Sequence, residues 1–292
     1  MAEITASKVK ELRDRTGAGM MDCKEALQAT AGELEEAIIF LRKKMGNKLE
    51  RREGRSTAEG VIATFISGNV AAIVELNSET DFVARNDDFK ALGREIAQQI
   101  VTNGGDSTDA ILAQDSLAAP GTTLQSRLQD VFTKLRENII FKRFERVDAG
   151  ENGAVAAYVH VPSNDKIGVM VELGDVTDAD AAQALGKELA MQIAAASPRY
   201  LTRDDVPAEI VAQESDIAAT QARNDGRPEA AIVKIVEGRV RKFYEETVLL
   251  DQVYVRDPKK SVSQVAKEIA PGVSVRRFIR YTVGESSKPA AE

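Results

Sequence analysis

The chain contains no tryptophan, a single cysteine and a single histidine. One cysteine, Cys23, excludes an internal disulfide and is typical of a reducing compartment. One histidine, His160, excludes a histidine-rich metal site. No apolar run approaches the ~18 residues that a membrane-spanning helix needs, and the N-terminus lacks the pattern of a signal peptide. These absences predict a cytoplasmic protein with no membrane partner.

Motifs of common catalytic and cofactor sites are also missing. The sequence has neither the Gly-x-x-x-x-Gly-Lys-Ser/Thr phosphate loop nor a Cys-x-x-Cys pair. A Ser-His-Asp triad would depend on His160 alone. The residues therefore favour a binding protein over an enzyme, and we expect no catalytic residue, no cofactor and no metal ligand.

The chain is instead rich in aliphatic and charged residues. Hydrophobic residues make up 43% of it and charged residues 29%, while aromatics make up only 5%. This balance is typical of a soluble globular protein, not a disordered one. Its 292 residues are enough for more than one core, built mainly from Val, Ile, Leu and Ala.

Negative charge dominates, but its distribution is uneven. The net charge of −7 argues against nucleic acid as the main partner, because phosphate binding needs a basic surface. Residues 42–55 nevertheless hold seven Lys or Arg against two Glu, and residues 255–281 hold seven basic residues against two acidic ones. Both segments are interpreted either as solvated surface or as a nucleic-acid contact.

Two segments of the chain nearly repeat each other. Residues 91–100 (ALGREIAQQI) and 184–193 (ALGKELAMQI) are identical at seven of ten positions, and a strand-like run ending in Val-Glu-Leu precedes each. The connection after the first run contains twelve residues, and the connection after the second contains eight. The four extra residues belong to a loop with Phe82 at its tip. A duplicated scaffold with one lengthened loop indicates that this loop reaches a partner.

The apolar periodicity predicts an α+β protein with antiparallel sheets. Each repeat reads as two strands followed by a helix, at 61–66 and 70–76 in the first half and at 154–161 and 167–173 in the second. We expect 107–148 to be largely helical, and a short helix (262–270) and a strand (273–283) to follow the second half. The expected parts are an N-terminal three-helix (UBA-like) module and linker (1–55), a first core subdomain carrying the lengthened loop (56–150), a second core subdomain (151–203), a protruding antiparallel helical hairpin (204–250), and a small C-terminal module and tail (251–292).

Three features could carry chemistry or binding, and each has two interpretations. The carboxylates of residues 79–88 suit either a divalent-metal site or the capping of the helix that starts near Phe89. Phe82 either folds back under its loop or faces a partner. The adjacent Met20 and Met21 either fill gaps in a core or form a deformable contact surface.

Four segments match a known family. They are residues 10–27 (KELRDRTGAGMMDCKEAL), 80–85 (TDFVAR), 237–243 (EGRVRKF) and 278–285 (FIRYTVGE). Together they resemble the signatures of the bacterial elongation factor Ts family, and the resemblance covers essentially residues 2–285.

The resemblance implies a nucleotide-exchange factor that binds the translational GTPase elongation factor Tu and promotes release of its GDP. In that family, the N-terminal module and the Asp-Phe loop engage the nucleotide-binding domain, where the Phe disturbs the phosphate loop and the Mg²⁺ site. Pairing of two such complexes is a further expectation. The partner-binding residues that the resemblance implies are Arg13, Met20, Met21, Thr80, Asp81, Phe82 and Val83, with His160 and Val255 as contacts of the second half.

The chain departs from the family pattern at Val253, where relatives usually have Pro, so the local turn there is open. Two other functions are weighed against nucleotide exchange. One is a translation-associated RNA-binding protein that uses the basic segments 42–55 and 255–281, and the other is a metal-dependent hydrolase that uses the carboxylates of 79–88. RNA binding would weaken steeply with salt, whereas binding through an apolar interface would not.

Overall fold

The computed structural model describes residues 4–16, 18–41 and 57–285 of the chain. Its N-terminal part is a small helical module of α1 (Ala6–Thr16), α2 (Met20–Ala29) and a helix at 34–41. Leu12, Cys23 and Leu27 are buried in its core and have no accessible surface. Among the residues that the structure describes, this core contains none beyond Leu41, so the module buries these apolar side chains independently of the main body.

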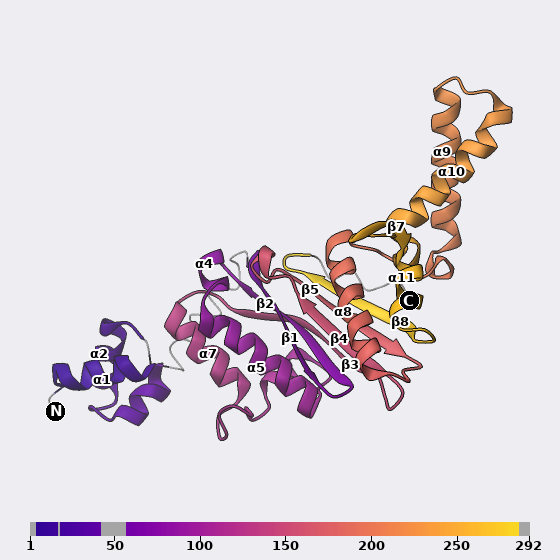
Figure 1. The fold of residues 1–292 in the computed structure, drawn as a ribbon. Coiled ribbons are helices and arrows are strands. Elements are labelled where there is room, and N and C mark those ends of the chain that lie inside the picture. The colour runs from indigo at the N-terminus through magenta and orange to yellow at the C-terminus, as the bar shows by residue number, and fades with distance from the viewer. Residues whose placement is uncertain (1–3, 17, 42–56, 286–292) are drawn as a thin grey trace.

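The first half of the main body is a three-stranded antiparallel sheet covered by helices (Figure 1). The strands are β1 (Glu59–Ser67), β2 (Val70–Ser78) and β3 (Ile140–Asp148), in the order β1-β2-β3. Between β2 and β3 come α4 (Asp81–Ala84), α5 (Asp87–Asn103), α6 (Thr108–Leu112) and α7 (Leu124–Leu135).

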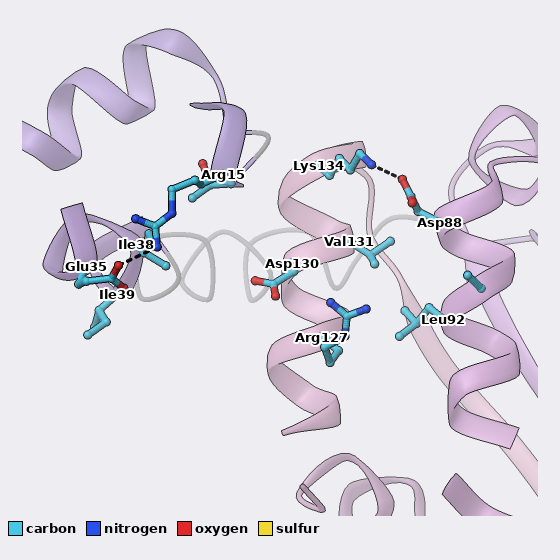
Figure 2. A pocket seen from close by; sticks show the side chains of 12 residues that line it. Arg15, Glu35, Ile38, Ile39, Asp88, Leu92, Arg127, Asp130, Val131 and Lys134 are labelled. Atoms are coloured by element: carbon cyan, nitrogen blue, oxygen red, sulfur yellow. Dashed lines mark hydrogen bonds and ion pairs between the residues drawn. The ribbon is translucent and has the colours of Figure 1, made fainter. Parts of the chain in front are cut away.

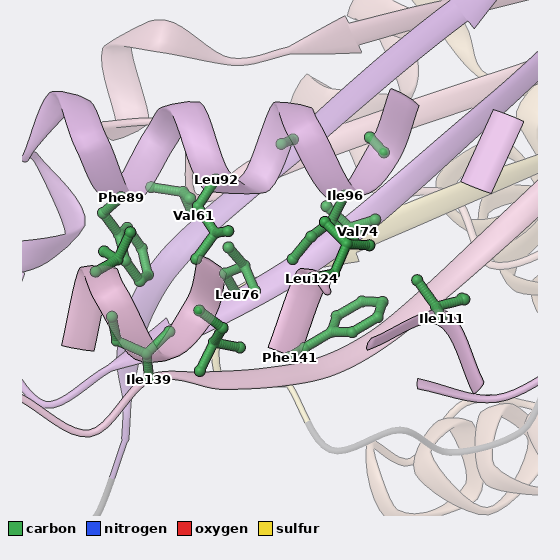
Figure 3. Close-up of a cluster of buried hydrophobic side chains, with 14 of the residues drawn as sticks. Val61, Val74, Leu76, Phe89, Leu92, Ile96, Ile111, Leu124, Ile139 and Phe141 are labelled. Carbon is green, nitrogen blue, oxygen red and sulfur yellow. The ribbon is translucent and has the colours of Figure 1, made fainter. Parts of the chain in front are cut away.

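The core of this half lies between the sheet and its helices (Figure 3). Leu92 and Ile96 of α5 project onto Val61, Val74 and Leu76 of the sheet. The shared helical face expected for α5 is therefore confirmed. Residues 140–148 correct the prediction that 107–148 is largely helical, because they pair with β2 along their whole length. Charged and apolar residues do not alternate regularly in this segment, so the sequence pattern alone does not indicate a strand.

The second half repeats this plan. Its sheet has the order β4-β5-β8, with β4 (Ala154–Val159), β5 (Ile167–Gly174) and β8 (Ser274–Thr282). Helices α8 (Ala179–Ala196) and α11 (Val262–Ile269) cover it. The C-terminal segment expected as a separate module therefore supplies the third strand of this sheet and a helix over it. A short η1 turn (Val161–Ser163) ends β4.

The two sheets pack face to face between the two layers of helices. Along β2, Ala72 and Val74 point to the first helical layer, while Ala71 and Ile73 point to the second sheet. Contact between the sheets is so close that a Cβ built on Gly168 would lie 2.3 Å from Cγ2 of Ile62. The hydrophobic alternation of the strands thus creates a third core, between the sheets.

A helical hairpin projects from the second half (Figure 1). It consists of α9 (Ala208–Asn224) and α10 (Glu229–Thr247), which confirms the expected pair of helices. Small residues, Ala218 and Ala222, are buried between them. Short elements follow: η3 (Leu249–Asp251), β6 (Val253–Tyr254) and β7 (Asp257–Ser261), while η2 (Arg203–Asp205) precedes α9.

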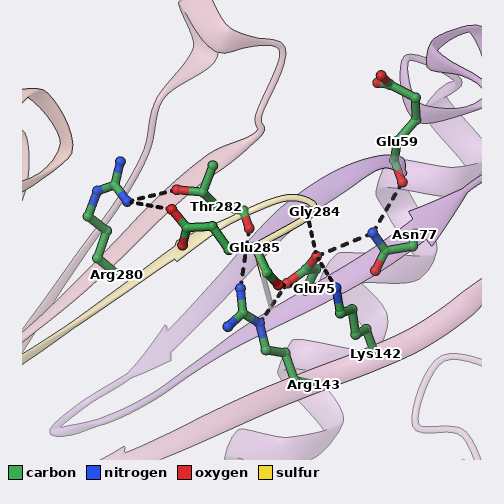
Figure 4. A network of polar contacts seen from close by, with 9 residues as sticks. All are labelled: Glu59, Glu75, Asn77, Lys142, Arg143, Arg280, Thr282, Gly284 and Glu285. Carbon is green, nitrogen blue, oxygen red and sulfur yellow. Dashed lines mark hydrogen bonds and ion pairs between the residues drawn. The ribbon is translucent and has the colours of Figure 1, made fainter. Parts of the chain in front are cut away.

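A buried carboxylate ties the halves together (Figure 4). Glu75 of β2 has no accessible surface, and its Oε2 lies 2.6 Å from Nε of Arg143. Its other oxygen accepts the backbone N–H of Gly284, just beyond β8, at 3.1 Å. Arg143 in turn donates to the carbonyl of Thr282 at 3.2 Å. One buried charge pair therefore joins the first sheet to the end of the last strand of the second.

Candidate functional site

The most exposed large hydrophobic side chain of the described residues belongs to Phe82, at 82% accessibility. It lies on α4, so the expected loop is one helical turn. Thr80 is the N-cap, and its side chain accepts the N–H of Val83. Phe82 is therefore presented outward, which contradicts the interpretation in which it folds back under its loop.

The same turn is anchored from below. Val83 is 7% exposed and Ala84 is 3% exposed, and both belong to the core of the first half. The side chain of Val83 points inward in the free protein, and its expected contact with a partner stays a prediction. Two buried residues hold the turn on the scaffold, while Phe82 faces solvent.

Side chains from the connection between α7 and β3 clamp the base of α4. The backbone N–H of Thr80 donates to Oε2 of Glu137 at 2.9 Å, and its hydroxyl donates to Oε1 at 2.6 Å. The N–H of Asn138 donates to Oε1 of Glu79 at 3.0 Å. No local pattern in the sequence indicates Glu137, because it lies 57 positions along the chain from Thr80.

The carboxylates around α4 are engaged in protein contacts. Asp81 forms an ion pair with Arg85 at 2.9 Å, and Asp88 pairs with Lys134. The cap of α5 is Asn86, whose Oδ1 accepts the N–H of Asp88 at 2.9 Å. The interpretation that a carboxylate such as Asp87 or Asp88 caps this helix is therefore wrong. Across the part of the chain that the structure describes, no group of three His, Cys, Asp or Glu has the geometry of a metal site.

A second apolar surface lies on the N-terminal module. Met20 and Met21, in the first turn of α2, are 60% and 75% exposed, so they do not fill the module's core. They line a groove of about 420 Å³ that also includes Arg13 and Val9. Cys23 lies behind them in the core, where burial raises the pKa of its thiol and keeps it protonated.

The connection after α7 contacts both the N-terminal module and the α4 turn. Arg136 adopts a left-handed backbone conformation, with φ of 62°, as the C-cap of α7. Its guanidinium lies 4.0 Å from the carboxylate of Asp22 on α2, while its neighbour Glu137 holds Thr80. One short connection therefore contacts both α2 and the N-cap of α4.

A larger groove of about 600 Å³ lies between the module and α7 (Figure 2). Its charges are mixed: Arg15 pairs with Glu35 at 2.6 Å, and Lys134 pairs with Asp88. A hydrogen bond from Arg127 to Glu95 raises the pKa of that guanidinium. Such balanced charge suits a polar seam between two parts of the protein and not a site for a ligand of one charge sign.

The remaining candidate residues lie on the second half. His160 precedes η1, and its Nδ1 lies 2.8 Å from the hydroxyl of Tyr158. The next residue, Val161, is 72% exposed and was missed by sequence analysis. Val255 is 49% exposed, and Oε1 of the buried Gln192 fixes its backbone N–H at 2.9 Å. The turn at Val253 is ordered by the same amide, which donates to its carbonyl at 3.2 Å.

The basic residues of 255–281 are largely paired with carboxylates. The pairs are Arg256 with Glu188, Lys260 with Glu268, Arg276 and Arg277 with Glu172, and Arg280 with Glu285. A surface whose cations are already neutralised is a poor phosphate-binding surface. The other basic segment, 42–55, lies outside the described residues.

Comparison with known proteins agrees with this architecture. The family model of elongation factor TS matches residues 79–285. A relative named elongation factor Ts, from Aromatoleum aromaticum, is 45% identical over 287 residues, which cover 98% of this chain and 92% of the relative. Another of that name, from Brucella ovis, is 44% identical over 289 residues, which cover 97% and 93%.

The α+β fold and these matches define a translation elongation factor. Within that class, the chain belongs to the elongation factor Ts family. None of the helices among residues 4–16, 18–41 and 57–285 has the length and hydropathy of a membrane span.

Proposed function

We propose that the chain is a guanine-nucleotide exchange factor that binds elongation factor Tu carrying GDP and promotes release of that GDP. The observation that carries this proposal is the aromatic ring of Phe82, which is 82% exposed on a turn anchored by two buried residues. An exposed ring on a rigid support can insert into a partner with little loss of conformational entropy.

The mechanism follows from differential binding. GTPases hold nucleotide through backbone N–H groups of the phosphate loop and through Mg²⁺. A protein that binds best to a conformation in which those contacts are strained shifts the partner toward that conformation and lowers its affinity for GDP. Phe82 and Asp81 would act beside the phosphate site, and Thr80 would hold their turn. No covalent step is needed.

Other contacts would supply affinity. Arg13, Met20 and Met21 offer a mixed apolar and basic groove to the same nucleotide-binding domain, and flexible methionines suit such a surface. His160 and Val255, on the second half, would contact a different domain of the GTPase. We expect the reaction in the cytoplasm, and pairing of two complexes stays a prediction.

The alternatives have less support. RNA binding through 255–281 would require cations that are engaged in ion pairs in the free protein. A metal-dependent hydrolase would require the carboxylates of 79–88 to converge, whereas Asp81 and Asp88 pair with Arg85 and Lys134.

The test is release of labelled GDP from purified elongation factor Tu, with and without this protein, at two salt concentrations. We expect faster release that changes little with salt, since the proposed interface is largely apolar. Calorimetry with nucleotide-free and GDP-loaded Tu should show weaker binding to the loaded form, by the factor by which this protein weakens GDP binding. Equal affinities for the two forms would contradict the proposal.

A further inference from the structure

We propose that Glu137 is a positioning residue for nucleotide exchange: it locks the α4 turn and thereby aims Phe82 at the partner. The inference rests on the proposed function. It concerns a residue that does not itself face the partner but controls one that does.

The lock is reciprocal. Both carboxylate oxygens of Glu137 are used on Thr80, one on its backbone N–H at 2.9 Å and one on its hydroxyl at 2.6 Å. In the opposite direction, the carboxylate of Glu79 accepts the backbone N–H of Asn138 at 3.0 Å. Two adjacent residues after α7 are therefore hydrogen-bonded to the two adjacent residues that precede α4. Hydrogen bonds to charged acceptors are the stronger kind, so this grip is well suited to fix a turn.

The turn needs such support because it is short. α4 has four residues, and an isolated helix of that length is not stable. Val83 and Ala84 hold its inner side, but apolar contacts are not directional and allow the turn to rock. The Glu137 carboxylate fixes Thr80, the N-cap of the turn, and hence the direction of Phe82.

The duplicated half shows that the fold itself does not need this lock. Strand registers pair Leu76 with Phe141 in the first half and Leu173 with Val275 in the second. The residue four positions before Val275 is Pro271, which has no carboxylate. The second half also has no turn comparable to α4 in its shorter connection. The carboxylate therefore accompanies the exposed aromatic and not the sheet and helix that the halves share.

Because the chain has no tryptophan, Phe82→Trp gives a single fluorescent reporter at the tip of the turn. The anisotropy of Trp fluorescence is measured in the full chain with Glu137 intact, in Glu137→Gln and in Glu137→Ala. The control is Glu268→Gln, which removes the partner of Lys260 on α11. The same substitutions at Glu137 and Glu268 are also made in the protein that keeps Phe82. Stimulated GDP release and the melting temperature are measured for those variants.

We expect anisotropy to fall in the order intact, Gln, Ala, because Gln keeps one uncharged acceptor and Ala keeps none. Stimulated release should fall about tenfold in Glu137→Ala, since hydrogen bonds to a charged acceptor are the ones lost, and less in Glu137→Gln. The melting temperature should change little, and Glu268→Gln should leave anisotropy and release unchanged. If Glu137→Ala fails to fold, the comparison of Glu137→Gln with the intact protein carries the test.

Unchanged anisotropy in both Glu137 variants would overturn the lock. Lower anisotropy with full stimulated release would overturn its role in exchange. A parent protein that does not stimulate GDP release would instead overturn the proposed function, and the anisotropy would still report whether Glu137 fixes the turn.

Discussion

Glu75 and Glu172 occupy the same place in the two sheets, each opposite an arginine at a β-bulge. Oε2 of Glu75 lies 2.6 Å from Nε of Arg143, and Oε2 of Glu172 lies 2.7 Å from Nε of Arg277. The strand register shifts directly after each glutamate. The duplication therefore includes the third strands, although the helical hairpin separates β8 from the rest of its half.

The two glutamates should differ in their contribution to stability. Glu75→Ala should lower the free energy of unfolding by about 3–5 kcal/mol, because it leaves the guanidinium of Arg143 buried without its charge partner. Glu172→Ala should cost less, since its side chain is 12% exposed and that of Glu75 is fully buried. Urea denaturation of both variants checks this order, and equal losses would contradict it.

Phe82→Ala should reduce stimulated GDP release by more than about tenfold, the equivalent of ~1.4 kcal/mol of activation free energy. Affinity for nucleotide-free elongation factor Tu should fall proportionally less, because part of the ring's binding energy goes into distorting the nucleotide site. The free energy of unfolding should change by less than about 0.5 kcal/mol, since the ring is exposed.

Phe89, seven residues later, is the matched control. It is fully buried, so Phe89→Ala should lower the free energy of unfolding by about 3–5 kcal/mol. A large fall in the melting temperature of Phe82→Ala would show that its ring stabilises the free protein instead of serving a partner.

Local patterns in the sequence predicted the elements that have strong periodicity. Leu185, Leu189 and Ile193 mark the buried face of α8, and the same pattern marks α5. The prediction of helix was wrong for residues 140–148, because a strand with charged residues at most positions shows no alternation of apolar and polar residues. Its identity depends on pairing with β2, which is a tertiary effect.

For the candidate site, too, the sequence predicted some features, while others depend on tertiary contacts. The lengthened connection indicated that this loop reaches a partner, but the sequence left open whether Phe82 folds back. The direction of Phe82 depends on Glu137, which lies far along the chain. Val83 faces inward because a short helical turn puts neighbouring residues on opposite sides, which a sequence read as a loop does not reveal. In α9, Ile217 is 40% exposed, whereas the smaller Ala218 and Ala222 are buried, a pattern that apolar periodicity alone does not reveal.

Two glycine substitutions should have opposite effects. A Cβ on Gly168 would meet the side chain of Ile62 between the sheets, so Gly168→Ala should lower the free energy of unfolding by about 1–3 kcal/mol. Gly238 lies inside α10 with nothing within 4 Å of an added Cβ, so Gly238→Ala should raise it by up to about 1 kcal/mol. Thermal denaturation of both variants tests the close contact of the sheets, and a neutral Gly168→Ala would contradict it.

Removal of residues 1–55 should separate folding from function. Within the described part of the chain, the cores of the two halves contain no residue before Val61, so the remainder should fold and melt cooperatively. Stimulated GDP release should fall sharply, because Met20, Met21 and Arg13 are lost with the module. Circular dichroism and the GDP-release assay on the truncated chain check both parts. Full activity would exclude the module from the mechanism.

Stability at alkaline pH should depend on Tyr281. Burial, with a smaller effect of the nearby negative charge of Glu145, raises the pKa of this phenol to about 12. An unfolded chain releases the same proton near pH 10, as ordinary tyrosines do. Between about pH 10 and about pH 12 the unfolded state therefore binds fewer protons than the folded state, and the free energy of unfolding falls as pH rises. Tyr281→Phe has no such proton, so its urea midpoint should fall less than that of the parent between about pH 9 and about pH 11.5. Parallel falls in the two proteins would show that other groups cause the alkaline loss.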